Sequence, residues 1–158
     1  MEWIQQIVNG ISLGSIYALI ALGYTMVYGI IKLINFAHGD VFMIGAFVGF
    51  YAIAGWGLGF FPALLLSMAV CAILGVIIER VAYKRLRNST RIAALITAIG
   101  VSLLIEYTMI YFRGAQPEAY PKVFTFQSFE LFGAQIDSQS ILILVITVVL
   151  MILLQIIV

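Results

Sequence analysis

Four long apolar runs constrain what this chain can fold into more than any other feature of its sequence. Residues 11–31, 58–78 and 141–158 contain no charged residue, and residues 92–112 contain one, Glu106. A helix rises about 1.5 Å per residue and the hydrocarbon core of a bilayer is about 30 Å thick, so roughly 20 apolar residues cross it. Of the 158 residues, 64% are hydrophobic and 9% are charged, whereas about 25% are charged in a soluble domain. These runs therefore predict transmembrane helices.

A fifth apolar segment, residues 41–54, is shorter than the others. As a helix it covers about 21 Å, which is less than a full crossing. It spans the membrane only if residues 33–39 lie partly within the bilayer, and a short half-span with polar flanks is typical of a discontinuous helix that lines a site. We therefore predict an all-α, polytopic transmembrane helix bundle in one domain over residues 1–158. Its five membrane segments are expected at about residues 11–31, 34–55, 58–78, 92–112 and 141–158.

The basic residues predict the orientation of the bundle. The only dense basic cluster lies in residues 79–91, and the positive-inside rule places such a cluster in the cytoplasm. If the short segment crosses, Lys32 is also cytoplasmic, the N-terminus is outside, and residues 113–140 form an extracytoplasmic loop. The alternative, in which residues 35–54 are re-entrant and the N-terminus is cytoplasmic, stays open. The basic cluster consists of Arg80, Lys84, Arg85, Arg87 and Arg91.

The outer loop carries its own signals. Pro117 and Pro121 interrupt any helix there. Residues 123–132 are rich in aromatic residues that partly alternate with polar ones, and residues 132–134 (FGA) offer a turn, so we expect a small β-hairpin. Asp137 or Ser138 is expected to cap the helix that follows.

Small residues recur at four-residue spacing in three of the segments. In lipid, helices associate by close packing, so rows of small residues predict contact faces between helices. Such rows are common in membrane proteins and favour a structural interpretation over a functional one. The residues that we expect at helix contacts are Gly10, Gly14, Ala18, Gly45, Gly49, Ala94 and Ala98.

Glu106 is the one acidic residue inside a long apolar run. It lies about four residues past the middle of its segment, roughly 6 Å from the bilayer centre. An ionisable group at that depth is costly, so by default it faces the protein interior or a wet cavity. Two interpretations stay open with about even weight: a protonated or hydrogen-bonded structural residue, and a member of a translocation pathway.

Residues 34–40 (INFAHGD) are the most informative polar segment. They place Asn35, His38, Gly39 and Asp40 between two apolar helices. The structural interpretation is a solvated loop in which Asp40 caps a helix that starts at Val41. The functional one is a break that faces a ligand, where exposed N–H groups at a helix start meet a carboxylate substrate. We assign these residues, with Glu106, to a candidate substrate pathway.

Several classes of protein are excluded by what the sequence lacks. A net charge of +1 argues against binding to nucleic acid. The single cysteine, Cys71, excludes an intramolecular disulfide, and one histidine beside one aspartate is too little for a metal site. There is no phosphate-binding GxxxxGK[ST] motif, no HExxH motif and no haem attachment motif. We therefore expect no enzyme activity, no metal and no cofactor.

The polar segment and its flanks carry a family resemblance. INFAHGDVFMIGAF (residues 34–47), preceded by NGISLGSIYALIALGYTMVYGIIKLI (residues 9–34), closely resembles the permease subunits of bacterial ABC importers for branched-chain amino acids. ERVAYKRLRNSTRIAALITAIGVSLLIE (residues 79–106) is similar to the next characteristic block of that family. Related permeases for urea and short amides share this pattern, so the resemblance indicates the family more firmly than the substrate.

The resemblance implies an assembly in the bacterial cytoplasmic (inner) membrane. Its expected partners are a second permease subunit, two cytoplasmic ATP-binding subunits, an extracytoplasmic substrate-binding protein and the lipid bilayer. Transport would proceed by alternating access, and ATP would be hydrolysed in the partner subunits. Permeases of this family are nearly twice as long and carry their ATPase-coupling loop in the later half, so we expect this sequence to be an N-terminal fragment without that loop.

A different class of function is a membrane subunit of a redox or proton-moving complex. A proton path usually shows several intramembrane acids or histidines in series. Only Glu106 lies clearly within a span here, so the importer interpretation is strongly favoured.

Overall fold

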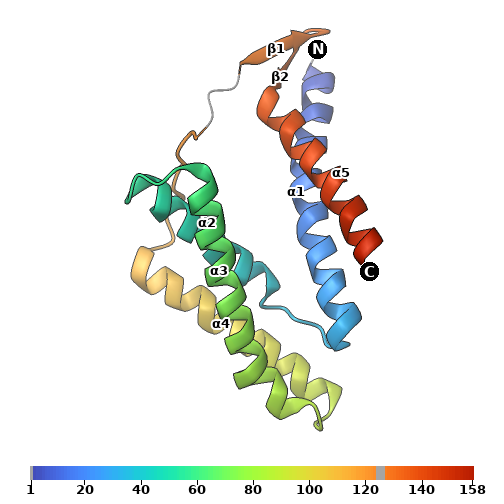
Figure 1. Cartoon of the computed structure of the whole chain (residues 1–158), viewed down its shortest axis with the longest axis vertical. Coiled ribbons are helices and arrows are strands. Elements are labelled where there is room, and N and C mark those ends of the chain that lie inside the picture. Colours follow the sequence, from blue (N-terminus) through green and yellow to red (C-terminus); the bar gives the residue numbers. More distant parts are fainter. Residues whose placement is uncertain (1, 124–126) are drawn as a thin grey trace. The chain divides into compact units, whose positions relative to one another are not determined.

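The computed structural model describes residues 2–123 and 127–158, which form five α-helices and one β-hairpin (Figure 1). The prediction of an all-α transmembrane bundle is confirmed. Four of the described helices are long and apolar enough to cross a membrane, and the fifth, α2, is a shorter apolar helix of 17 residues. The α-helices are α1 (Glu2–Ile31), α2 (His38–Ala54), α3 (Phe60–Ile78), α4 (Arg91–Arg113) and α5 (Ser138–Ile157).

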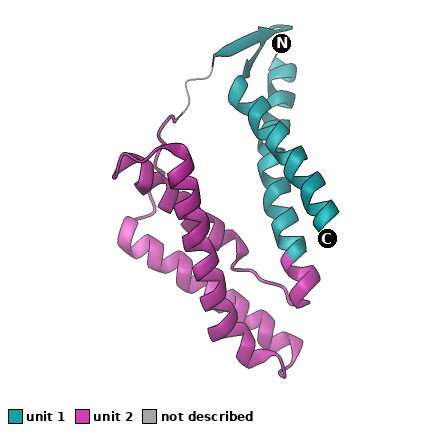
Figure 2. Cartoon of the chain, viewed as in Figure 1, with its two compact units in different colours: residues 1–26, 124–158 teal, residues 27–123 magenta. Residues whose placement is uncertain are grey.

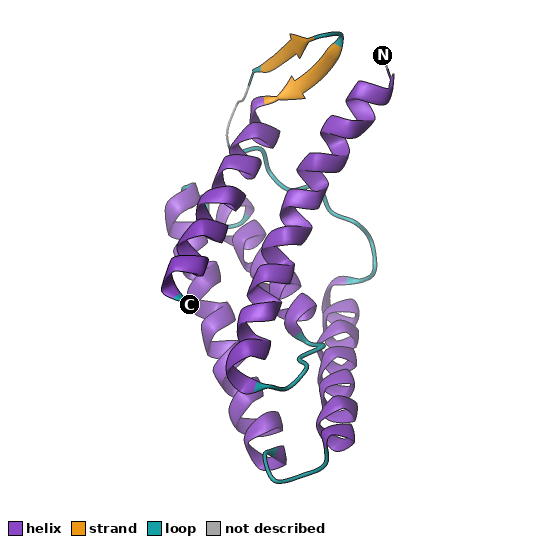
Figure 3. Cartoon of the chain, turned by 90° about the vertical axis from the view of Figure 1, so that its right-hand side faces the viewer, coloured by secondary structure: helices purple, strands orange, loops and turns teal. Residues whose placement is uncertain are grey.

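The chain divides into two compact units, residues 1–26 with 124–158 and residues 27–123 (Figure 2). In the first unit, strands β1 (Ser128–Leu131) and β2 (Ala134–Asp137) pair antiparallel (Figure 3). The two residues between them, Phe132 and Gly133, both have positive φ angles of 52° and 80°, as the tight hairpin turn that matches strand twist requires. The expected hairpin is therefore confirmed in its described part, while residues 124–126 of the aromatic segment lie outside the described residues.

Hydrogen bonds tie this hairpin to the start of α1. The side chain of Gln5 donates to the carbonyl of Gln135 at 3.0 Å and accepts from the amide of the same residue at 2.8 Å. Helix α5 follows β2 directly. Asp137 occupies its N-cap position but makes no side-chain capping bond, and the hydroxyl of Ser138 donates to the carbonyl of Gln127 instead. Asp137 is therefore at the predicted N-cap position, but the predicted capping hydrogen bond is not formed.

In the second unit, helix α3 continues beyond its apolar segment. It passes into a π-helical turn, η1 (Glu79–Tyr83), and a 3₁₀ turn, η2 (Lys84–Leu86). The thirteen-residue cytoplasmic loop expected at residues 79–91 is therefore largely helical, and only residues 87–90 connect it to α4. The segment ERVAYKRL consists mostly of good helix formers, and Arg87 reaches back to Glu79 in an ion pair of 2.9 Å.

The interior of the chain is made of small residues. Ala52, Ala63, Ala94 and Ala98 are almost fully buried, whereas no large side chain among the described residues is completely buried. Most isoleucine, leucine and phenylalanine side chains point outward. This distribution fits helices that associate through small residues and present apolar side chains to lipid or to other subunits.

Candidate functional site

The polar segment forms a sharp break between α1 and α2. Helix α1 ends where Lys32 adopts a left-handed conformation with φ of 59°, and the amide of Lys32 bonds to the carbonyl of Tyr28 at 2.9 Å. Six residues later the chain enters α2. The side-chain oxygen of Asn35 accepts the amide hydrogen of Ala37 at 3.1 Å, so Asn35 satisfies one of the free N–H groups at the helix start.

Tyr83, in η1 after α3, also contacts the polar segment. Its hydroxyl donates to the same side-chain oxygen of Asn35 at 3.1 Å and lies 3.4 Å from the carbonyl of Ile34. Tyr83 is only 4% exposed and packs in a cluster with Ala37, Ile78 and Ala98. The start of α2 is thereby joined to the end of α3 and to α4 through one buried ring.

Asp40 connects the first turn of α2 to the middle of α4. Its carboxylate accepts a short hydrogen bond from the hydroxyl of Ser102. The structural interpretation in which Asp40 caps a helix beginning at Val41 is wrong, because α2 begins at His38. Asp40 is instead a side-chain acceptor for a neighbouring helix, which is how a carboxylate is retained among apolar helices.

The other candidate pathway residues lie around this break in different environments. His38 is half-buried at the first position of α2, and Gly39 is exposed with open space where a side chain would project. Glu106 lies one helical turn beyond Ser102 on α4, and its side chain is exposed on this chain, not directed into its interior. The structure therefore brings Asn35, His38, Gly39 and Asp40 together and leaves Glu106 on an outer face. No group of three or more His, Cys, Asp or Glu residues within the described ranges is placed to hold a metal ion.

The expected packing residues fall into two groups. Gly45, Gly49, Ala94 and Ala98 are all buried. A methyl group added at Gly45 would lie 2.6 Å from the sulfur of Cys71, so α2 and α3 approach closely there. Along α1 the corresponding positions are open: Gly10 and Gly14 have nothing within 4 Å of an added methyl group, and Ala18 is half-buried.

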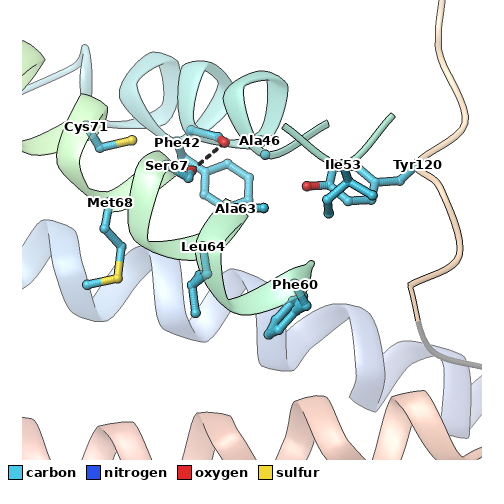
Figure 4. Close-up of a pocket in the computed structure, with 12 residues that line it drawn as sticks. Phe42, Ala46, Ile53, Phe60, Ala63, Leu64, Ser67, Met68, Cys71 and Tyr120 are labelled. Carbon is cyan, nitrogen blue, oxygen red and sulfur yellow. Dashed lines mark hydrogen bonds between the residues drawn. The ribbon is translucent and has the colours of Figure 1, made fainter. Parts of the chain in front are cut away.

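A pocket of about 280 Å³ lies between α2 and α3 (Figure 4). The hydroxyl of Ser67 donates to the carbonyl of Gly45 at 2.5 Å, and the thiol of Cys71 donates to the carbonyl of Val41 at 3.4 Å. At one end stands Tyr120, from the segment after α4. The residues that line the pocket are Phe42, Gly45, Ala46, Gly49, Ile53, Phe60, Ala63, Leu64, Ser67, Met68, Cys71 and Tyr120.

Arg113 fixes the segment that carries Tyr120. Its guanidinium lies 4.5 Å from the ring centroid of Tyr51 and donates to both carboxylate oxygens of Glu118 at 2.8 Å. The Nε atom of Arg113 is buried without a hydrogen-bond partner among the described residues. Partial burial raises the pKa of Tyr120 above its ordinary value, because a phenolate would lose hydration there. The phenol therefore remains protonated at neutral pH.

Three residues of this arrangement were not identified from the sequence as parts of the site. Ser102 was predicted only as part of a membrane segment and Arg113 only as part of an outer loop, while nothing in the basic segment distinguished Tyr83. The available signal for Ser102 was its hydroxyl within an apolar run four positions before Glu106, but Thr97 and Thr108 in the same run carry hydroxyls as well. Tyr83 required the structure, because its partner Asn35 is 48 residues away.

Comparison with known proteins identifies the family. The model of the family described as branched-chain amino acid transport system / permease component matches residues 6–158. The high-affinity branched-chain amino acid transport system permease protein BraD of Pseudomonas aeruginosa is 43% identical over 95% of this chain and 53% of its own length. The corresponding LivH proteins of Salmonella typhimurium and Escherichia coli are each 44% identical over 93% of this chain and 52% of theirs. The chain thus spans about half the length of the curated relatives it matches, and no solved structure gives a significant match. With its apolar helices and this match over nearly all of its residues, the chain belongs to the family of branched-chain amino acid transport permease components and is a multi-pass membrane protein.

Proposed function

We propose that the complete protein is the membrane-spanning permease of an ATP-driven importer for branched-chain amino acids. The observation that carries this proposal is the family match over residues 6–158, supported by relatives named as permease proteins of high-affinity branched-chain amino acid transport systems. In this proposal the chain pairs with a second permease subunit in the bacterial inner membrane. Two cytoplasmic ATP-binding subunits supply the energy and an extracytoplasmic binding protein delivers the substrate.

The proposed orientation follows the charges. Five basic residues lie within residues 79–91, which include the polar extension of α3 and the first residue of α4, and the positive-inside rule assigns this end of the helices to the cytoplasm. The opposite end of α4 then leads into an extracytoplasmic segment that contains Arg113, Glu118 and Tyr120. Helix α2, at about 26 Å, crosses most of the hydrocarbon layer between these two sides.

Within this proposal the break before α2 is part of the substrate pathway. Its Asn35 and Asp40 side chains bond to residues of two other helical segments, Tyr83 and Ser102. Any movement of these segments relative to one another must therefore rupture or re-form the hydrogen bonds of Asn35 and Asp40. Alternating access requires groups of this kind, whose bonding differs between an outward-open and an inward-open state.

The test is uptake by the complete importer in a bacterial strain that lacks its own branched-chain transport. Cells that express the full permease with its partner subunits should accumulate labelled leucine, and urea in excess should not compete. Asn35→Ala, His38→Ala and Asp40→Ala should each reduce uptake severalfold while the protein still inserts in the membrane. Asn88→Ala, in the exposed connection before α4, is the matched control and should transport normally. Normal uptake by all three variants would remove the break from the pathway, and uptake of urea alone would overturn the substrate assignment.

A further inference from the structure

The pocket between α2 and α3 has the character of a small-ligand site. Its volume of about 280 Å³ lies just below the range of about 300–1,000 Å³ that drug-sized ligands occupy. None of its lining residues is charged, and most are aliphatic or aromatic. A molecule of the size of an amino acid is therefore the appropriate occupant, with its apolar part inside.

Small residues create this space. Gly45 and Gly49 lie one turn apart on α2 and line the pocket, and Ala63 of α3 lines it too (Figure 4). The helices touch at Gly45, where a Cβ atom would lie 2.6 Å from Cys71 and 3.3 Å from Ser67. The pocket therefore lies beside a close approach of the two helices.

Two polar side chains of the walls, Ser67 and Cys71, are already hydrogen-bonded. Ser67 donates its hydroxyl hydrogen to Gly45 and Cys71 donates its thiol hydrogen to Val41, in both cases to a backbone carbonyl of α2. These groups do not need a polar partner from a ligand. An apolar group consequently enters without leaving a buried donor unpaired, whereas a charged group would find no counter-charge in the lining.

Tyr120 lines one end of the pocket. Its hydroxyl lies 2.5 Å from where a Cβ of Gly49 would be, and its ring meets Phe50 edge-on at 6.0 Å between centroids. The segment that carries it is held to α4 by the Arg113–Glu118 ion pair. In the proposed orientation this end faces the extracytoplasmic side, from which substrate arrives.

We propose that this pocket receives the aliphatic side chain of a branched-chain amino acid, with Tyr120 as the residue that closes over it. The inference rests on the proposed import function and assigns to it a side-chain subsite on the α3 face of α2, opposite the face that carries Asp40. The charged amino and carboxylate groups of the substrate stay outside the apolar walls. The other apolar occupant that a membrane offers is a lipid acyl chain, which the experiment distinguishes.

Cys71 provides a direct reporter of occupancy, because it lines the pocket and is the only cysteine among residues 1–158. The complete importer is reconstituted in phosphatidylcholine vesicles and treated with a membrane-permeant maleimide, and labelling of the Cys71 peptide is followed by mass spectrometry. Saturating isoleucine should slow this labelling at least threefold, and glycine, which has no side chain, should leave it unchanged.

A matched pair of variants tests the same subsite by transport. Leu64 lines the pocket and is 43% exposed, whereas its neighbour Leu65 does not line it and is 67% exposed. Leu64→Trp should raise the KM for isoleucine uptake at least fivefold and abolish protection of Cys71. Leu65→Trp should transport and protect as the wild type does, and because neither leucine is buried both variants should fold.

The outcomes separate the two proposals. If the wild-type importer takes up isoleucine but isoleucine does not protect Cys71, the subsite is wrong and the import function stands. Labelling that changes only with the acyl-chain length of the vesicle lipid identifies a lipid site and also overturns the inference. If the wild-type complex takes up no branched-chain amino acid, the proposed function itself fails.

Discussion

The hydroxyl of Tyr83 and the side-chain oxygen of Asn35 meet at 3.1 Å, although 48 residues separate them in the sequence. The same oxygen of Asn35 accepts the amide of Ala37 at the start of α2. One amide oxygen thus fixes both the first turn of α2 and the ring at the end of the α3 extension. Hydrogen bonds to the side-chain oxygen of Asn35 therefore hold part of the polar break in place.

This relationship predicts the effect of removing a single oxygen atom. Tyr83→Phe keeps the buried ring and its packing but removes the donor to Asn35. Hydrogen bonds between membrane helices contribute about 0.6–1 kcal/mol each. The free energy of unfolding of the variant should therefore be lower by about that amount, and its unfolding temperature should fall. Thermal unfolding of the complete permease in detergent measures it. Tyr107→Phe, an exposed tyrosine on α4, is the control, and equal stability of both variants would contradict the hydrogen bond.

The bond between Asp40 and Ser102 predicts coupling between α2 and α4. Ser102→Ala removes the donor, and Asp40→Asn keeps an acceptor while removing the charge. Because hydrogen bonds to charged groups contribute about 1.5–3 kcal/mol, Ser102→Ala should destabilise by about that amount in the wild type and by clearly less in the Asp40→Asn background. The double-mutant cycle is measured by denaturant unfolding. Additive effects would show that the two residues do not interact.

Two glycines in different settings should respond oppositely to the same substitution. At Gly45 an added methyl group meets the sulfur of Cys71 at 2.6 Å, and at Gly14 it meets nothing within 4 Å. Gly45→Ala should therefore cost about 1–3 kcal/mol through overpacking, whereas Gly14→Ala should stabilise α1 by up to about 1 kcal/mol through helix propensity. Unfolding of the complete permease compares them. If another part of the complete protein packs on Gly14, the stabilisation will be absent there.

The helices could be predicted from the sequence because their causes are local. A run of about 20 residues without charge has few stable alternatives in a membrane protein, and the turn residues Phe132 and Gly133 mark the hairpin in the same way. Helix α3 ends at Ile78, where the apolar run ends, but helical turns continue through η1 and η2 to Leu86, because the change from apolar to basic residues at Glu79 does not stop helical structure. Polarity and helix termination are separate properties of that segment.

The arrangement around the break was less predictable because its contacts are distant in sequence. The polar character of residues 34–40 was evident, but α2 begins at His38 and not at Val41, next to the amide of Ala37 that Asn35 accepts. The partner of Asp40 on α4 and the partner of Asn35 beyond α3 follow from helix packing. Periodicity along one helix does not specify which neighbour it meets.

Arg113 supports a last prediction, on the segment that closes the α2–α3 pocket. Its guanidinium lies over the ring of Tyr51 while one of its nitrogens donates to both oxygens of Glu118, and a lysine ammonium lacks the planar group that lies over the ring. Arg113→Lys keeps the charge, yet it should free the segment around Tyr120 and increase its hydrogen exchange severalfold. Glu118→Gln should have a smaller effect, because a partly exposed ion pair contributes only about 0–1 kcal/mol while the stacking on Tyr51 is retained. Hydrogen exchange of residues 114–123 in the complete permease measures both variants, with Lys122→Gln as the control. If Arg113→Lys and Lys122→Gln exchange alike, the stacked arginine does not hold this segment, and the closure of the pocket by Tyr120 must depend on its own contacts with Gly49 and Phe50.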